Sequence, residues 1–419
     1  MKKRLAILSG ILLTAVTGIT TGADTTVRIL HLQDNPKFLE LWKQIGAEFE
    51  KQNPGVKINW QFLENEALKA KLPTMLQSSE RPDLFYSWAG GVFYDQARAG
   101  VLRDITKFME GEWADTLSPA GVKAFTYEGK VYGAPMKTSL EILWYNKALL
   151  EKAGVDPASL ATWNGFLDAV KKCKAAGITP LATGGGDKWP LHFYWTMLAL
   201  RIGGKEAFEA AYDRKGEGFD SPTFVKAGEM FKELIDLEPF QPGFLGAKYP
   251  DAAGYFGDGR AAMFFMGDFL YAGQKQSSKS GEGIPDDQLG FVPFPAVEGG
   301  KGNEDVLGAV EGWLVAKGAP DEAVKFLRFF LNKENQTKMA AAGIHIPLTK
   351  GAEAALANPF YRRVAEDFNK APYLQIVYDQ FLGANVGRVV NDISADLAAD
   401  AITPEEAAKT VEEAWQSEK

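Results

Sequence analysis

The alternation of strand-like and helix-like segments near the start of the chain limits the fold most strongly. Two stretches, 27–32 and 56–62, are rich in the β-branched and aromatic residues that favour strands. Between them, apolar residues recur at the spacing of one helix face: Phe38, Leu41, Trp42, Ile45 and Phe49. A second helical pattern, interrupted by Pro73, leads to a short apolar strand at 84–86. Strands that alternate with helices build parallel sheets, so this order predicts an α/β fold with a parallel, doubly wound sheet.

The first 23 residues have the features of a cleaved export signal. The basic residues Lys2, Lys3 and Arg4 precede an apolar stretch at 5–19, and small residues follow at 21–23. A membrane anchor is the alternative, but this stretch is short and is broken by serine, threonine and glycine residues. We therefore expect a mature chain that starts at residue 24, lies in the periplasm and has no stable membrane insertion.

Charge and cysteine content restrict the partners of the mature chain. Loss of the three basic residues of the signal lowers the formal net charge from −8 to −11. An acidic surface repels phosphate backbones, so we expect no nucleic acid partner. Cys173 is the only cysteine, so it cannot form an internal disulfide, and no cysteine near residue 24 offers a site for a lipid.

The sequence lacks the local motifs of several enzyme classes. It has no His-Glu-x-x-His, no Gly-x-Ser-x-Gly and no phosphate-binding loop, and it contains only three histidines. The glycines at 184–186 follow a strand-like run and are predicted to be a flexible turn. We therefore predict no metal, no cofactor and no catalytic residue. A secreted glycoside hydrolase stays an alternative, because its two catalytic acids need no local motif.

A strand at 140–145 that ends in Tyr145-Asn146-Lys147 resembles the first inter-lobe crossing of the bacterial extracellular solute-binding proteins of the maltose-binding-like, sugar-binding type. Three other segments are similar to parts of the same family: 49–58, 81–85 and 256–263. The resemblance spans nearly the whole mature chain. It implies a two-lobed periplasmic-binding-protein fold whose lobes are joined by about three crossings, near 135–141, 308–314 and 343–348.

The resemblance also implies that each lobe is built from separate pieces of the chain. We expect the first lobe to contain residues 24–137 and 314–371, and the second lobe to contain residues 138–313 and 372–419. The protein is expected to be a monomer.

Polar and aromatic residues follow the predicted parallel strands at their carboxyl ends, where such sheets bind ligands. Asp34 follows the first strand, Glu64 and Asn65 follow the second, and Trp88 and Gly91 follow the third. Trp88 is predicted to present its ring to a ligand; the alternative is a core position over the end of the sheet. Glu64 could equally cap a helix.

The resemblance implies further binding residues near the crossings and in the second lobe. Ser139 and Glu141 lie two apart on the first crossing and hence on one face of a strand. Gly312 could let a ligand approach the backbone. The complete set of these further candidates is Ser139, Glu141, Trp189, His192, Asp268, Glu311, Gly312, Trp313, His345, Tyr378 and Asp379. Asp379 lies among apolar neighbours and needs a partner, which could be a sugar or an arginine.

The 10 Trp, 13 Tyr and 27 Phe of the chain suit a sugar site, because sugar rings stack on flat aromatic faces and their hydroxyls bond to polar groups. We expect the protein to bind a disaccharide or trisaccharide and to deliver it to the membrane permease subunits of an ABC importer. A polyamine is the alternative ligand, since Asp34, Glu64, Glu141, Glu311 and Asp379 could surround a polycation.

Overall fold

The computed structural model describes residues 25–418, so the predicted signal at 1–23 lies outside the described residues. Three parallel strands open this part of the chain: β1 (Thr25–His31), β2 (Val56–Phe62) and β3 (Leu84–Trp88), in the spatial order β2, β1, β3. The helices α1 (Pro36–Gln52) and α2 (Asn65–Met75) connect them. The β-α-β-α-β order predicted from the sequence is therefore confirmed.

Local signals explain the bounds of α1. Asn35 caps its start, because the side-chain oxygen accepts hydrogen bonds from the backbone N–H groups of Lys37 and Phe38 at 3.0 and 3.4 Å. After the helix, Gly55 takes a positive φ of 89° that turns the chain into β2. One face of the helix carries its buried residues, which are Trp42, Ile45, Gly46 and Phe49.

A single long strand, β6 (Gly133–Asn146), runs through both lobes of the fold. Its first part pairs antiparallel with β10 (Val306–Val315), and its last part pairs with β8 (Ala261–Gly267) and β9 (Leu289–Val292). Partners change between Leu140 and Glu141, so the strand leaves one lobe and enters the other there. The sequence predicted a strand only at 140–145, and the observed strand is longer because β10 extends the pairing backwards to Gly133.

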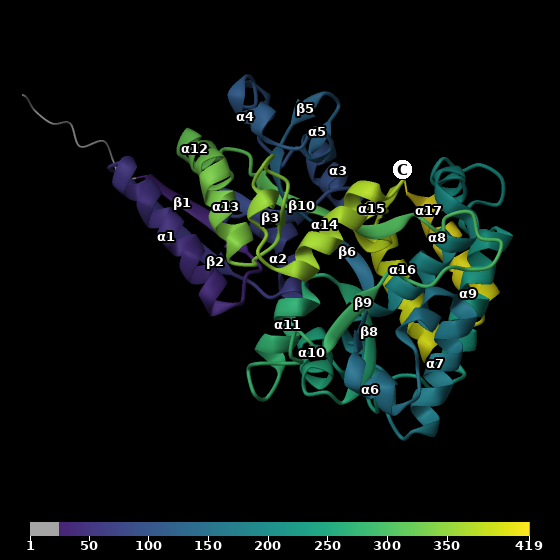
Figure 1. The fold of residues 1–419 in the computed structure, drawn as a ribbon. Helices are drawn as coiled ribbons and strands as arrows, with labels where there is room; N and C mark the ends of the chain where they lie inside the picture. Colours follow the sequence, from purple (N-terminus) through teal and green to yellow (C-terminus); the bar gives the residue numbers. More distant parts are fainter. Residues whose placement is uncertain (1–24, 419) are drawn as a thin grey trace, which may run out of the picture.

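The first lobe combines segments that are far apart in the sequence. Figure 1 shows α1 beside α12 (Asp321–Phe330) and α13 (Lys333–Ala341), on the same side of the molecule as β1 and β2. Strand β10 is antiparallel to β3, so β10 and β6 extend the parallel strands into a mixed sheet. The other helices and strands of the first lobe before β6 are α3 (Gly91–Arg98), α4 (Glu112–Thr116), α5 (Pro119–Ala124), β4 (Thr126–Tyr127) and β5 (Lys130–Val131). Strand β11 (Ile346–Pro347) follows α13 and pairs with β6.

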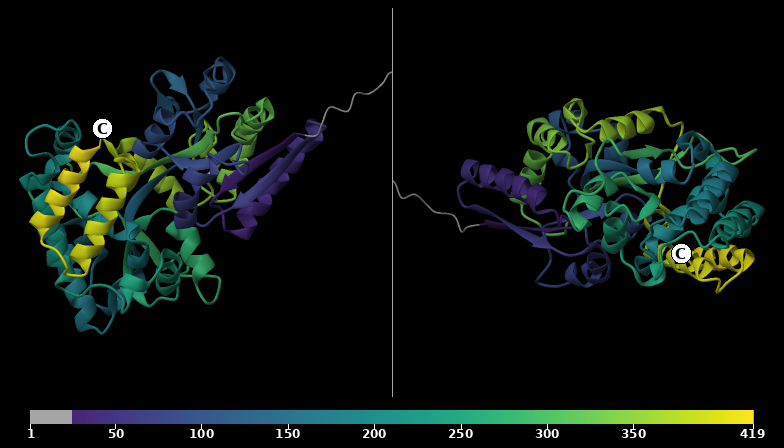
Figure 2. Two further views of the ribbon diagram at one scale, coloured as in Figure 1. Left: turned by 180° about the vertical axis from the view of Figure 1, so that it is seen from behind. Right: turned by 60° about the horizontal axis from the view of Figure 1, so that its bottom comes forward.

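The second lobe surrounds the last part of β6 with helices. The C-terminal helices α16 (Gly383–Ala398) and α17 (Pro404–Ser417) pack on α8 (Trp189–Tyr212) and α9 (Pro222–Ile235), as both views of Figure 2 show. The other elements here are α6 (Lys147–Lys152), α7 (Trp163–Ala175), β7 (Thr179–Leu181), α10 (Tyr249–Gly257), α11 (Leu270–Ser277), β12 (Leu374–Ile376) and α15 (Tyr378–Phe381). Helix α14 (Pro359–Lys370) lies in the sequence between β11 and β12.

Separate hydrophobic cores give each lobe its stability. One large cluster contains Trp144 and Trp195, whereas Trp42 and Trp313 belong to another cluster in the first lobe. Tyr361 and Val364 of α14 pack into the large cluster, although residues up to 371 were expected in the first lobe. The residue at which the chain changes lobe after β11 stays a prediction.

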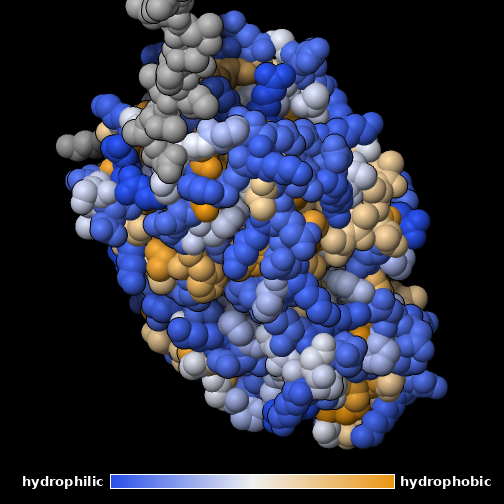
Figure 3. Space-filling model, turned by 90° about the vertical axis from the view of Figure 1, so that its left-hand side faces the viewer, coloured by the Kyte–Doolittle hydropathy of each residue, from blue (hydrophilic) through white to orange (hydrophobic). Residues whose placement is uncertain are grey.

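The outer surface of the first lobe is largely hydrophilic. Figure 3 shows this face covered mostly by hydrophilic residues, with small separate hydrophobic patches. Within residues 25–418, no helix has both the length and the apolar character needed to cross a bilayer.

Candidate functional site

A cavity of about 440 Å³ lies between the two lobes. The ends of β1, β2 and β3 form one wall, and residues of α8, α10 and α11 form the opposite wall. Strands β6 and β10 contribute residues next to the hinge. Most of the predicted site residues line this cavity: Asp34, Glu64, Asn65, Trp88, Ser139, Glu141, Trp189, Glu311, His345 and Asp379.

The alternation of side chains along β6 directs one face of the hinge strand into the cavity. Lys137, Ser139 and Glu141 are two residues apart, and all three line the cavity. Glu311 of β10 receives a hydrogen bond from the Ser139 hydroxyl at 3.1 Å and lies 3.0 Å from the Lys137 ammonium. Burial raises the pKa of the Glu311 carboxyl, and the adjacent ammonium opposes this shift.

The ends of the first three strands supply polar and aromatic side chains. The Glu64 carboxylate accepts hydrogen bonds from the backbone N–H groups of Glu66 and Ala67, so it caps α2 as well as lining the cavity. Trp88 is half-buried, and its ring lies edge-on to Tyr86 with a centroid distance of 5.5 Å. Both Trp88 and Glu64 therefore contact other residues of the first lobe as well as lining the cavity.

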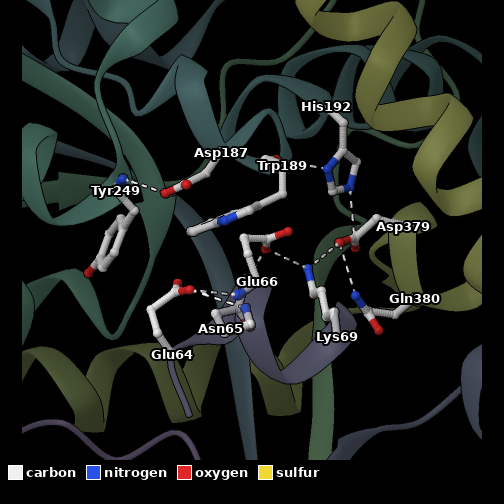
Figure 4. Close-up of polar contacts among 11 residues, drawn as sticks. Glu64, Asn65, Glu66, Lys69, Asp187, Trp189, His192, Tyr249, Asp379 and Gln380 are labelled. Carbon is white, nitrogen blue, oxygen red and sulfur yellow. Dashed lines mark hydrogen bonds and ion pairs between the residues drawn. The ribbon is translucent and has the colours of Figure 1, made fainter. Parts of the chain in front are cut away.

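The second lobe contributes a group of aromatic rings. Trp189, Tyr249 and Phe269 lie within 5.5 to 6.4 Å of one another between ring centroids, and all line the cavity. Asp187 fixes this group, because its carboxylate accepts a hydrogen bond of 2.7 Å from the backbone N–H of Tyr249. Figure 4 shows the ring of Trp189 between Tyr249 and the polar residues of the first lobe.

A charged network crosses from one lobe to the other. The Lys69 ammonium of α2 lies 3.4 Å from the Asp379 carboxylate of α15 and 3.2 Å from Glu66 (Figure 4). The His192 ring nitrogen Nε2 lies 3.8 Å from Asp379. Burial alone would raise the pKa of Asp379, but Lys69 and His192 outweigh it, so the pKa is lowered. Asp379 thus has a lysine partner where the sequence suggested a sugar or an arginine.

Three predicted residues near β3 and β10 do not line the cavity. Trp313 is 1% exposed and packs among the core rings Trp42, Tyr86 and Phe330. At Gly312, a Cβ atom would lie 2.2 Å from the Ala134 carbonyl oxygen, so the glycine admits a neighbouring strand and not a ligand. At Gly91, the backbone of the second lobe approaches in the same way, because a Cβ atom there would lie 2.4 Å from the backbone nitrogen of Gly383.

Three predicted residues of the second lobe also lie behind the cavity wall. Tyr378 is 1% exposed and stacks on Phe208 with a centroid distance of 4.9 Å. His192 is fully buried and contacts Asp379 from behind. Asp268 binds the hinge strand, because its carboxylate accepts a hydrogen bond of 3.2 Å from the Leu140 N–H. These residues support others that do line the cavity.

Several cavity residues were not predicted. Lys137 could have been found by extending the two-residue spacing of Ser139 and Glu141 one step backwards. Lys69, Tyr249 and Phe269 carried no such signal, because they reach the cavity from helices or turns that only the packed fold brings there. Asp187 directly follows the glycines at 184–186, which were predicted to be only a flexible turn.

Among residues 25–418, no three histidine, cysteine or acidic side chains are grouped so that they could hold a metal ion. Two of the cavity acids, Glu311 and Asp379, are instead paired with lysines.

Comparison with known proteins identifies the family. The model of the family described as bacterial extracellular solute-binding protein matches residues 35–337. The chain belongs to this family. An uncharacterised ABC transporter extracellular-binding protein of Pyrococcus horikoshii is 25% identical over 342 residues, which are 79% of this chain and 74% of that protein. A probable sugar-binding periplasmic protein of Mesorhizobium japonicum is 32% identical over 214 residues, which are 50% of this chain and 49% of that protein.

Solved structures have the same two-lobed fold. A structure from a study of xylan utilisation by Caldanaerobius polysaccharolyticus is 28% identical and has a TM-score of 0.86, covering 93% of this chain and 99% of that chain. A chitin oligosaccharide binding protein is 24% identical with a TM-score of 0.84, covering 94% of this chain and 99% of that chain. The two-lobed α/β fold predicted from the sequence is therefore confirmed.

Proposed function

We propose that this protein is the periplasmic receptor of an ABC importer and that it binds a sugar of two or three units between its lobes. The observation that carries the proposal is the convergence of aromatic rings and polar groups from both lobes on one cavity. Trp88 and Trp189 line the cavity from opposite lobes, and indole rings can stack on sugar rings. The volume of about 440 Å³ falls within the range of small-molecule sites, which is roughly 300 to 1,000 Å³.

The relatives support a sugar as the ligand class. The Mesorhizobium relative is named as a probable sugar-binding periplasmic protein, and the 28% identical structure comes from work on xylan utilisation. Oligosaccharides of xylose are thus the first ligands to test. The periplasmic location rests on the export signal predicted at residues 1–23 and on the extracellular character of the family.

A polyamine is the less favoured ligand. It would need several unpaired carboxylates around an extended polycation. Six acids line the cavity, but Lys69 and Lys137 already pair with Asp379 and Glu311. Hydrolysis is not favoured either, because the family is one of binding proteins. We propose binding without turnover.

We further propose that the lobes close on the sugar by bending at β6, at β10 and at a third crossing near residues 343–348. The change of strand partners at residues 140–141 of β6 supports the first of these positions. Closure would bury the ligand and shape the surface that the permease subunits recognise.

Isothermal titration calorimetry of the mature protein tests the proposal. Xylobiose, xylotriose, maltotriose, raffinose and spermidine form the panel. We expect saturable one-to-one binding of at least one oligosaccharide, and chromatography after overnight incubation should recover that sugar intact. Binding of spermidine alone would favour the polyamine, and release of reducing sugar in proportion to protein would favour the hydrolase.

A further inference from the structure

Three residues that line the cavity carry a buried polar atom without a hydrogen-bond partner among residues 25–418. These atoms are Trp42 Nε1, Glu141 Oε2 and His345 Nδ1. The Trp42 ring is part of the first-lobe core, where it contacts Trp313 and Phe330. Glu141 and His345 are different, because both lie at the hinge end of the cavity. A buried polar atom without a partner destabilises the protein, so a ligand that satisfies it gains binding energy.

Within the described part of the chain, Glu141 forms no ion pair of its own. It is 5% exposed, and Lys137, which points from the same face of β6, is bound to Glu311 at 3.0 Å. The other charged groups around Glu141 are mostly acids: Asp268 after β8 and Asp379 on α15. Burial and these two carboxylates raise the pKa of Glu141 well above its usual range, and the nearby Lys137 ammonium offsets only part of this rise. A carboxyl in this setting keeps its proton more readily and can donate a hydrogen bond.

His345 offers the complementary group. Its Nε2 lies 2.9 Å from Gln336 Oε1, and the Gln336 amide nitrogen donates to the Phe330 carbonyl at 3.2 Å. The glutamine oxygen therefore faces the ring, so Nε2 carries the proton and Nδ1 is left as an acceptor. Burial and Lys137 lower the pKa of His345 to about 3, which keeps the ring neutral.

The two groups lie side by side along the hinge. Ile346 of β11 pairs with Thr138 in an antiparallel register, which places His345 next to Ser139, and Glu141 is two residues farther along β6 on the same face. We propose that Glu141 and His345 determine the specificity of the site by hydrogen bonding to hydroxyls of an uncharged sugar, with Glu141 as donor and His345 Nδ1 as acceptor. The inference rests on the proposed function and adds to it that sugar acids are excluded, because a ligand carboxylate has no proton to donate to His345 Nδ1 and would lie near the Asp379 carboxylate, which lines the same cavity.

Calorimetry with matched ligands and variants tests the inference. Xylotriose, maltotriose and galactobiose are the neutral probes, and digalacturonic acid is the acidic counterpart of galactobiose. Glu141→Leu and His345→Phe should each weaken binding of the tightest neutral probe at least tenfold, whereas Glu141→Gln, which can still donate, should stay within about threefold. Digalacturonic acid should bind wild type at least a hundredfold more weakly than galactobiose or not at all.

Thr138→Val is the matched control on the same strand. The Thr138 hydroxyl donates to the Ala309 carbonyl at 3.0 Å and does not line the cavity, so this variant should bind as wild type does. Thermal unfolding checks that each variant is folded.

If Glu141→Leu or His345→Phe fails to fold, the pH dependence of sugar binding by wild type is measured in its place. Affinity should fall as pH rises and Glu141 loses its proton, and this fall should be clearly smaller in Glu141→Gln. The charged or titratable groups around Glu141 in this titration are Lys137 with its partner Glu311, Asp268, Asp379, Tyr249 and His345.

The outcomes separate the inference from the proposed function. If wild type binds a neutral probe and both Glu141→Leu and His345→Phe keep its affinity, the inference is wrong and the sugar receptor stands. Tight binding of digalacturonic acid, or of a glucosamine dimer whose binding is lost in Glu141→Gln, would also overturn the inference. If no neutral probe binds wild type, the proposed function fails first.

Discussion

Trp88 is the aromatic residue of the first lobe best placed to contact a sugar. It lines the cavity, its ring is half-buried, and the Lys69 ammonium lies 5.6 Å from the ring centroid. Trp88→Ala should weaken sugar binding about thirtyfold, because truncation of a central aromatic anchor costs about 2 kcal/mol. Calorimetric titration measures this loss.

The alternative for Trp88 is a structural role, and one further measurement separates the two. A buried core tryptophan would cost about 3–5 kcal/mol of stability on truncation. We expect the unfolding temperature of Trp88→Ala to stay near that of wild type. A strongly destabilised variant that binds with native affinity would show that the ring belongs to the core.

His31 makes stability depend on pH. It is 1% exposed among the rings of Trp42, Trp60 and Phe62, and burial lowers its pKa to about 4. Between pH 6.5 and pH 4 the unfolded chain binds a proton that the folded chain excludes, so this contribution to stability is lost as pH falls through that window.

Comparison with His31→Gln isolates this effect. The difference in unfolding free energy between wild type and His31→Gln should change by about 1.4 kcal/mol per pH unit in the window, with wild type losing more at low pH. Urea unfolding at pH 7, 6, 5 and 4 gives the difference. A constant difference across this range would contradict the assignment.

At the scale of elements, α3 meets the α15–α16 junction by backbone contact across the lobes. A Cβ atom on Gly91 would lie 2.4 Å from Gly383 N and 2.5 Å from the Phe381 carbonyl oxygen, both of which are backbone atoms. Gly91→Ala should therefore destabilise the protein by about 1–3 kcal/mol, the usual cost of overpacking. Gly246→Ala is the control, since its φ is not positive and no atom lies within 4 Å of the added methyl group. Equal urea midpoints for the two variants would argue against this contact.

The ion pair between Lys69 and Asp379 joins α2 to α15. Lys69→Met leaves the Asp379 carboxylate, which is 8% exposed, without its cation. We expect a loss of about 1–3 kcal/mol in unfolding free energy, and part of it should return in the double variant Lys69→Met, Asp379→Asn. Lys71→Met, at an exposed position of the same helix, should change stability by less than about 0.5 kcal/mol. A Lys69→Met variant as stable as Lys71→Met would show that the pair contributes little.

For the whole molecule, the sequence predicts the fold better than the site. The alternation of strands and helices at 27–86 suffices for the parallel strands, and the strand ends place Asp34, Glu64 and Trp88 at the cavity. Trp313 was expected at the site together with Glu311, which lies two residues away on β10, but it lies farther into the first lobe, where Trp42 of α1 and Phe330 of α12 cover it. The sequence does not say how far along the strand these helices reach. Tyr249 and Phe269 reach the cavity only through packing of the second lobe.

A crystal structure of the mature protein with its tightest-binding oligosaccharide tests the central claim most directly. The account predicts a sugar between the lobes, with a ring against Trp88 or Trp189 and hydroxyls within hydrogen-bond distance of Glu141 and His345. A sugar bound on the outer face of one lobe, with the cavity between the lobes filled only by water, would contradict it.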